Sequence, residues 1–299
     1  MSIVDEIMRL KSKKEAVFLI HNYQIPEVQD IADFLGDSLG LAKEAAETDS
    51  RMIVFCGVRF MAETAKILSP EKTVLLPRKD AGCPMADMIT REQLKALKSE
   101  HPDAKVVSYV NTSAHVKAES DVCCTSANAV AVVRNIKADK IIFTPDKNLA
   151  AYCQRFVDKE IIPWSGYCYV HERITKEEVL LAKTRYPDAV LLVHPECRPS
   201  VIDVADAVLS TSGMVDFAKK SEKKRFLIGT EQGLIYRLKK ECPGKEFYAA
   251  GTAKLCRSMK LTTLKDVLLS LREERHAIEL PERIIESARR ALEAMLDYV

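Results

Sequence analysis

Short apolar runs alternate with amphipathic stretches along this chain of 299 residues, and the alternation repeats at long range. Residues 89–111 read ITREQLKALKSEHPDAKVVSYVN, which predicts a helix with a capping box at Thr90 and Gln93, then a PDA turn and a β-rich strand. Residues 174–196 read ITKEEVLLAKTRYPDAVLLVHPE and have the same order of elements at an offset of 174 − 89 = 85. The N-terminal stretch at 2–23 fits the same frame at an offset of 90 − 2 = 88.

The repeat continues downstream of these three stretches. Each copy next contains a short strand that ends in hydroxyl or small residues, at 32–40, 120–128 and 205–213. An apolar run suited to a buried parallel strand follows at 51–57, 139–145 and 224–230. The last strand of each copy is expected at 73–77, 160–163 and 246–250. Agreement in successive segments predicts an internal triplication.

The triplication predicts the fold class. Each copy has about four strands that alternate with helices, which is typical of an α/β unit with a parallel sheet. We expect three homologous α/β units with pseudo-threefold symmetry around a central active site. The expected domains are residues 1–83 together with the C-terminal helices at 257–299, then 84–168, then 169–256.

Composition and charge exclude several classes of partner. Hydrophobic residues make up 47% and charged residues 29% of the chain, and the formal net charge is +2, so neither nucleic acid nor a membrane surface is an expected partner. The N-terminus reads as an amphipathic helix without the apolar core of a signal peptide, which predicts a cytoplasmic protein. The nine cysteines contain no CxxC pair and are expected to be reduced there.

Candidate chemistry lies at the carboxyl ends of the predicted strands, where parallel α/β units bind ligands. Superposition of the copies brings residues into equivalent places there: His21, Tyr109 and His194; Tyr23, Asn111 and Glu196; Ser38, Ser126 and Thr211; Cys83, Cys168 and Cys256. The three cysteines each follow the last strand of a copy, so three units around one axis bring three thiols into a central site.

Three thiols leave the identity of the metal open at this point. Soft sulfur ligands suit zinc, copper(I) or an iron–sulfur cluster. A structural zinc needs a fourth protein ligand, which His171 could supply from its place three residues after Cys168. A [4Fe–4S] cluster on three cysteines leaves one iron open as a Lewis acid. The polar strand-end residues favour the open site, and hydroxyls that precede helices favour a substrate with several anionic groups.

The other cysteines and histidines are expected to have structural roles. Buried filler is the interpretation for Cys56, Cys123, Cys124, Cys153 and Cys242. Cys197 follows Glu196 and is expected to be filler or a bystander near the site. His101 and His276 lie in charged helical surroundings typical of a surface, and His115 is ambiguous.

Several motifs together resemble quinolinate synthase: HNYQIPEVQDIADFLGDSL, GVRFMAETAKIL, CPMAD, YVNTSA, TSANAV, PDKNLA, HPEC and STSGM. They run from residue 21 to 214, and KLCRSMK around Cys256 extends the match. The resemblance implies three α/β/α domains around a [4Fe–4S] cluster. It implies condensation of iminosuccinate (iminoaspartate) with dihydroxyacetone phosphate to quinolinate in NAD biosynthesis, with loss of phosphate and water. Transient contact with the enzyme that supplies the imine is a further expectation.

The resemblance also implies roles for individual positions. The cluster ligands would be Cys83, Cys168 and Cys256. The substrate-contacting positions would be His21, Ser38, Tyr109, Val110, Asn111, Ser126, His194, Pro195, Glu196 and Thr211. Among the catalytic positions, Glu196 and Tyr23 would handle protons, His21 and His194 would orient substrate, and His171 is a further active-site position. The hydroxyls and Asn111 would hold carboxylate or phosphate oxygens.

This chain departs from the pattern in three places. Arg59 stands where an acid or histidine is expected, and Tyr169 follows Cys168 where a proline is frequent. No second cysteine lies close to Cys256, so disulfide regulation there is not expected.

Three other functions compete with this interpretation. Another cluster-dependent hydro-lyase on the same frame would differ only in substrate. A non-catalytic metal or electron-transfer protein would use four protein ligands and would not need anion-binding helix starts. A sugar-phosphate-binding module without metal would not need the three matched cysteines.

Overall fold

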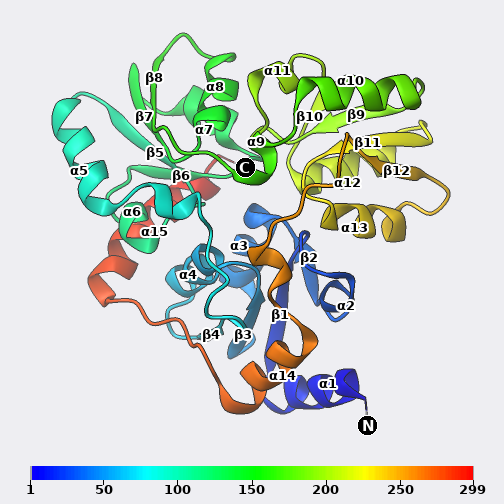
Figure 1. Ribbon diagram of the computed structural model, residues 1–299. Coiled ribbons are helices and arrows are strands. Elements are labelled where there is room, and N and C mark those ends of the chain that lie inside the picture. The colour runs from blue at the N-terminus through cyan, green and yellow to red at the C-terminus, as the bar shows by residue number, and fades with distance from the viewer. Residues whose placement is uncertain (1, 299) are drawn as a thin grey trace.

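Three four-stranded parallel sheets form the protein, whose computed structural model describes residues 2–298. Their strand orders are β2-β1-β3-β4, β6-β5-β7-β8 and β10-β9-β11-β12, which is one topology used three times. Figure 1 shows the three units as lobes around a common centre. The predicted fold class, three α/β units with pseudo-threefold symmetry, is therefore confirmed.

The elements of the three units follow the same plan. The first contains α1 (Ile3–Lys13), β1 (Ala16–His21), α2 (Pro26–Gln29), β2 (Phe34–Gly36), α3 (Ser38–Glu47), β3 (Met52–Cys56), α4 (Arg59–Leu68) and β4 (Thr73–Leu75). The second contains a 3₁₀ turn (Ala86–Met88), α5 (Arg91–Glu100), β5 (Lys105–Tyr109), α6 (Ala114–Lys117), β6 (Val122–Cys124), α7 (Ala129–Asn135), β7 (Lys140–Thr144), α8 (Lys147–Gln154) and β8 (Glu160–Pro163). The third contains α9 (Tyr169–Glu172), α10 (Lys176–Arg185), β9 (Val190–Val193), α11 (Pro199–Ile202), β10 (Ala207–Val208), α12 (Thr211–Lys220), β11 (Arg225–Gly229), α13 (Gly233–Glu241) and β12 (Glu246–Ala249).

The strand register is also repeated. In the first sheet Leu19 lies opposite Phe34 on one side and Phe55 on the other. Its equivalent in the second sheet, 107 − 19 = 88 residues later, pairs with Val122 and Phe143, and the third sheet has the same arrangement. The sequence offsets therefore correspond to equivalent positions in space.

The central strand β1 of the first sheet is buried on both faces. Along β1 every residue is buried, and successive side chains enter different apolar clusters: Val17 and Leu19 face one, and Phe18 and Ile20 face the other. Strands of this kind are continuously apolar because helices cover both sides of a parallel sheet. This is why the apolar runs, rather than an alternating pattern, predicted the strands.

Local hydrogen bonds reinforce the repeat. The predicted capping boxes of α5 and α10 are present, and α1 begins with another one. One aspartate in each unit accepts a hydrogen bond from a backbone N–H of the first strand, fifteen residues earlier. These aspartates are Asp33, Asp121 and Asp206. Their spacings, 121 − 33 = 88 and 206 − 121 = 85, match the offsets of the repeat.

The C-terminal segment adds a 3₁₀ turn (Ser258–Lys260), α14 (Leu264–Glu273) and α15 (Glu282–Leu296). Helix α14 packs on α1 of the first unit, whereas α15 contacts α4 of the first unit and both α6 and β6 of the second. The orange and red segments of Figure 1 follow this path. The boundaries proposed after residues 83, 168 and 256 stay predictions.

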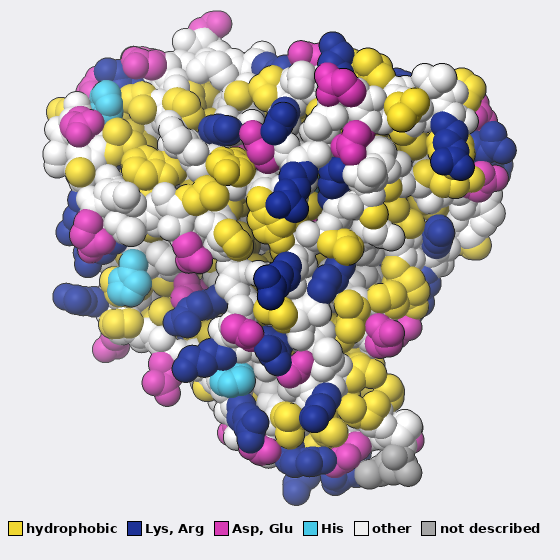
Figure 2. Space-filling model, viewed as in Figure 1, with side chains coloured by type: hydrophobic (Ala, Val, Ile, Leu, Met, Phe, Trp, Pro, Cys, Tyr) yellow, Lys and Arg dark blue, Asp and Glu magenta, His cyan; other side chains and the backbone are white. Residues whose placement is uncertain are grey.

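The surface carries mixed charges. Figure 2 shows lysine and arginine side chains interspersed with acidic ones on the face in view. Within residues 2–298, every helix is too short or too polar to cross a membrane.

Candidate active site

One cavity lies where the carboxyl ends of the three sheets converge. It is partly open to solvent. Of the residues proposed for the site from the sequence, it is lined by His21, Tyr23, Ser38, Cys83, Tyr109, Asn111, Ser126, Cys168, His171, His194, Glu196, Thr211 and Cys256. The structure thus brings together residues that are up to 256 − 21 = 235 positions apart.

Two predicted substrate contacts lie outside this cavity. Val110 is buried and lines a small neighbouring cavity that it shares with Ser38 and Phe60. Pro195 lines an outer groove. Neither has a side chain on the central cavity, so their contact with substrate stays a prediction.

The three cysteines reach the cavity from three units, each after the last strand of its sheet. Two of their backbones are held by buried carboxylates that follow the third strand. Asp146 accepts a hydrogen bond from the Cys168 N–H at 3.1 Å, and Glu231 accepts one from the Cys256 N–H at 3.1 Å. The equivalent position near Cys83 is Val58, since 146 − 58 = 88 and 231 − 146 = 85.

Burial dominates the titration of the thiols. It raises the pKa of Cys83 to about 12 and raises the pKa values of Cys168 and Cys256 as well. Thiols of this kind are protonated in the absence of a metal, so that metal binding has to release their protons. The hydroxyl of Tyr169, one of the departures from the family pattern, accepts the N–H of Arg257, the residue after Cys256, at 2.7 Å.

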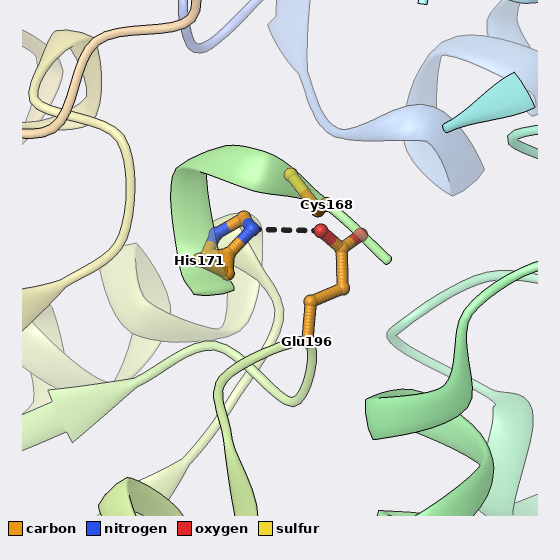
Figure 3. A group of neighbouring side chains, drawn as sticks. All are labelled: Cys168, His171 and Glu196. Carbon is orange, nitrogen blue, oxygen red and sulfur yellow. Dashed lines mark ion pairs between the residues drawn. The ribbon is translucent and has the colours of Figure 1, made fainter. Parts of the chain in front are cut away.

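A chain of polar groups runs along one wall of the cavity. The Tyr23 hydroxyl lies 2.5 Å from Thr230 Oγ1, which lies 2.8 Å from His171 Nε2. His171 Nδ1 lies 2.7 Å from Glu196 Oε2, but the two atoms do not form a hydrogen bond. Tyr109 donates its hydroxyl to Glu196 Oε1 at 2.5 Å. Figure 3 shows His171 and Glu196 turned toward each other beside Cys168.

The electrostatics of this wall keep Glu196 ionised. Burial alone would raise the pKa of Glu196, but His171, His194 and the Tyr109 hydroxyl together lower it below its ordinary value. Burial and the Glu196 charge raise the pKa values of both Tyr23 and Tyr109 well above 10. Glu196 is therefore a carboxylate base that lies among protonated phenols.

Two histidines at equivalent positions are neutral donors. His21 Nδ1 accepts the Tyr23 N–H at 3.1 Å, and His194 Nδ1 accepts the Glu196 N–H at 3.3 Å. Burial lowers the pKa of His21 to about 4 and that of His194 to about 3. Because Nδ1 accepts in both rings, the hydrogen of each is on Nε2.

The predicted hydroxyls lie at or near helix starts. Ser38 and Thr211 are the first residues of α3 and α12, whose N-caps are Asp37 and Ser210. Ser126 precedes α7 by three residues. The two N-caps also join the first and third units, because Ser210 Oγ donates to Asp37 Oδ2 at 3.0 Å.

A metal-ligand set can be assembled from Cys168, His171 and Glu196, whose ligand atoms lie within 4.8 Å of one another. His171, however, contacts Thr230 through Nε2 and Glu196 through Nδ1. Because Nε2 already has a hydrogen-bond partner, Nδ1, which lies beside Glu196 without a hydrogen bond, is the nitrogen that remains open to a metal.

The burial of the remaining cysteines and histidines agrees in most cases with the structural roles expected for them. Cys56, Cys123, Cys124, Cys153, Cys197 and Cys242 are all buried, as expected of filler. His115 and His276 are exposed, and His101 is half-buried at the end of α5. The exposed Arg59 pairs with Glu63 at 3.0 Å on α4.

Sequence reasoning missed Thr230, Asp146 and Glu231. All three follow the third strand of their unit, a strand end that the superposition of the copies did not include. Asp146 lies within PDKNLA, which the sequence analysis had singled out. Comparing residues after the third strands would have found the two carboxylates, but nothing local distinguishes Thr230.

Comparison with known proteins identifies the relatives of this chain. The family model described as "Quinolinate synthetase A protein" matches residues 5–297. The quinolinate synthase of Alkaliphilus metalliredigens is 54% identical over 297 residues, covering 99% of this chain and 98% of the relative. That of Methanoregula boonei is 54% identical over 292 residues (98% and 97%), and that of Thermodesulfovibrio yellowstonii is 53% identical over 297 residues (99% and 98%).

Proposed function

Because this chain belongs to the quinolinate synthase family and is an enzyme of NAD biosynthesis, we propose that its central cavity condenses iminosuccinate with dihydroxyacetone phosphate. The products would be quinolinate, phosphate and water. We further propose that Cys83, Cys168 and Cys256 hold a [4Fe–4S] cluster there. The observation that carries the proposal is the convergence of three thiols from three repeated units on one cavity.

The donor set fits this cluster. Three thiols line the cavity, whereas Nε2 of the nearest imidazole, His171, already has a hydrogen-bond partner. Such a set leaves one iron without a protein ligand. When bound, the cluster would supply a Lewis acid for an oxygen or nitrogen of the substrate.

The polar lining would bind and orient the anionic substrates. His21 and His194 present neutral N–H donors, which suit carboxylate oxygens without adding charge. Asn111 Oδ1 is buried and has no hydrogen-bond partner within residues 2–298. A donor of the substrate, such as the imine N–H or a hydroxyl, would satisfy that oxygen. The helix starts at Ser38 and Thr211 add backbone N–H groups for anionic oxygens.

The acid–base assignments follow from protonation. Glu196 is the ionised base, and it would take a proton from a carbon beside the imine or carbonyl group. Tyr23 is protonated and would donate to an oxygen that leaves as water. Tyr109 would stabilise the Glu196 carboxylate through its short hydrogen bond.

An outer groove offers a route to the cavity. It shares Asp37 and Ser126 with the central cavity, and Lys43 and Arg134 contribute to its walls. The two cations would attract phosphate and carboxylate groups. Residence in the cytoplasm and transient contact with an imine-supplying enzyme remain predictions.

The test is anaerobic purification followed by measurement of iron, sulfide and zinc in the wild type and Cys83→Ala. About four irons and four sulfides per chain are expected, mostly lost in the variant. The buried bystander Cys153→Ala is the matched control and should keep them. Quinolinate formation from the two substrates would then be assayed. Stoichiometric zinc without sulfide, or metal unaffected by the loss of Cys83, would contradict the proposal.

A further inference from the structure

Tyr169 connects the loops that carry two of the three cysteines of the proposed metal site. It is the first residue of α9 and follows Cys168 directly. Its hydroxyl accepts the N–H of Arg257, the residue that follows Cys256, at 2.7 Å. The guanidinium of Arg173, at the end of α9, lies 5.5 Å from the centre of the Tyr169 ring and favours this orientation of the ring. One side chain therefore reaches from one cysteine loop to another.

This contact joins equivalent positions of two repeats. The residues that follow the three cysteines are Pro84, Tyr169 and Arg257, and their spacings, 169 − 84 = 85 and 257 − 169 = 88, are the offsets of the repeat. The side chain of Pro84 has no donor or acceptor, so no such contact can start from the first cysteine loop. The contact is therefore not required by the repeated fold, and depends on a tyrosine at one position.

The Cys256 loop, residues 251–257, lies at the surface. It runs without helix or strand from the end of β12 to the following 3₁₀ turn. Leu255 is 54% exposed, and Arg257 is exposed as well. Neither of them is among the described residues that line the central cavity, so solvent reaches this loop from outside the cavity.

Few hydrogen bonds hold the Cys256 loop in place. Bonds to Glu178 and Glu231 attach it to its own unit. Within residues 2–298, the bond from Arg257 to Tyr169 is the only hydrogen bond between this loop and the segment that begins at Cys168. Loss of the Tyr169 hydroxyl would therefore free the two metal-binding segments from each other while each stays attached to its own sheet.

Resting on the three-cysteine site of the proposed function, we propose that Tyr169 is a latch that keeps the Cys256 loop closed over the metal site and limits the rate at which iron leaves it. When the hydrogen bond breaks, the exposed loop moves outward and solvent reaches the metal. When it forms, the loop is held against Cys168. One neutral hydrogen bond changes such a local opening equilibrium by about tenfold or less, so the latch controls how often the loop opens.

The test measures the release of iron from the anaerobically purified enzyme that contains its cluster, mixed with the Fe²⁺ chelator bathophenanthroline disulfonate. Tyr169→Phe keeps the ring and removes the hydroxyl, whereas Tyr169→Ala removes both. Tyr236→Phe is the matched control, because the Tyr236 hydroxyl also makes a hydrogen bond, to Asp30 at 2.7 Å, but outside the cysteine loops.

We expect Tyr169→Phe to raise the rate of iron release by about 3- to 10-fold, which is the effect of one lost neutral hydrogen bond on loop opening. Tyr169→Ala should raise it further, because the contact with Arg173 is lost as well. Tyr236→Phe should release iron at the wild-type rate.

Hydrogen exchange of the same enzymes, measured by mass spectrometry, reports the opening itself. In both Tyr169 variants the peptide that spans residues 252–257 should exchange faster, because the Arg257 N–H has lost its acceptor. Exchange in the central strand β5 should not change. A merely structural tyrosine would alter exchange across the sheets rather than in this loop alone.

Two results would overturn the latch. One is a wild-type rate of iron release in both Tyr169 variants. The other is faster release with unchanged exchange of residues 252–257, or with faster exchange throughout the sheets. A wild-type enzyme that contains no iron–sulfur cluster would instead overturn the proposed function, and the latch with it.

Discussion

Replacing Glu231 by glutamine should destabilise the junction between two active-site loops. The side chain is fully buried and accepts hydrogen bonds from Cys256 N at 3.1 Å and Gly233 N at 2.6 Å. It also pairs with Lys260 Nζ at 2.9 Å, and Lys260 hydrogen-bonds the Tyr23 carbonyl. One carboxylate therefore connects the Cys256 loop to the Tyr23 loop.

The size of the effect follows from these contacts. Glutamine has only one acceptor oxygen, so its NH₂ group would face one of the two backbone N–H groups. The hydrogen bond from that N–H to a charged acceptor would be lost, at a cost of about 1.5–3 kcal/mol. Removing one partner of a buried ion pair costs about 3–5 kcal/mol. The Lys260 side chain is 23% exposed and can recover some hydration, which favours the lower end of that range. We expect the free energy of unfolding to fall by about 3 kcal/mol.

Urea unfolding followed by circular dichroism measures this change, with iron content as a second readout. Iron should fall, because the Cys256 backbone loses its anchor. Glu286→Gln, at an exposed position of α15, is the control and should change the free energy of unfolding by less than about 0.5 kcal/mol. The double variant Glu231→Gln with Lys260→Met should recover part of the loss, since it removes the unpaired ammonium. A loss below about 1 kcal/mol in Glu231→Gln would refute the reasoning.

Three further changes test other parts of the structure. Burial lowers the pKa of His21 to about 4, so the unfolded chain binds a proton at higher pH than the folded chain, and the free energy of unfolding falls as the pH drops from about 6.5 to 4. His21→Asn should reduce that fall by up to about 3 kcal/mol, measured by urea unfolding at pH 7 and pH 4.5. The control His115→Asn, at an exposed position, should leave it unchanged. The Lys159 ammonium donates hydrogen bonds to backbone carbonyls at the end of α7. Lys159→Met removes these bonds and should lower the free energy of unfolding by about 1–2 kcal/mol. An unchanged midpoint of urea unfolding would contradict this. A Cβ atom at Gly166 would clash with the carbonyl oxygen of Pro145. Gly166→Ala should therefore displace the loop before Cys168 and lower the iron content. A variant with the full iron content would contradict this prediction.

The sequence allowed much of the fold to be predicted because helix and strand signals are local. The capping boxes at Thr90 and Thr175 marked helix starts that the structure contains. The predicted last strand at 160–163 has the bounds of β8. The repeat offsets of 85 and 88 also identified Cys83, Cys168 and Cys256 as one set, because equivalent positions in repeated units come together around the symmetry axis.

The remaining parts of the site depend on contacts that no local pattern encodes. Thr230 and Tyr23 are 230 − 23 = 207 positions apart, and their hydroxyls meet only when the first and third units close on each other. Val110 and Pro195 are adjacent in the chain to residues that line the central cavity. Val110 nevertheless lines a small neighbouring cavity, and Pro195 lines the outer groove. The direction of a side chain after a strand depends on the turn that follows, which the local sequence pattern did not predict.

The triplicated α/β architecture, the set of three cysteines and the family could be predicted from the residues alone, because repetition and local periodicity run along the chain. Three other features come from the packing of the units: the neighbours of the two His171 nitrogens, the ionisation of Glu196 among protonated phenols, and the hydrogen bonds by which Asp146 and Glu231 hold two of the three cysteine loops. The physical reason is that protonation and hydrogen-bond direction depend on burial and on neighbours supplied by all three units. These properties exist only after the units have packed together.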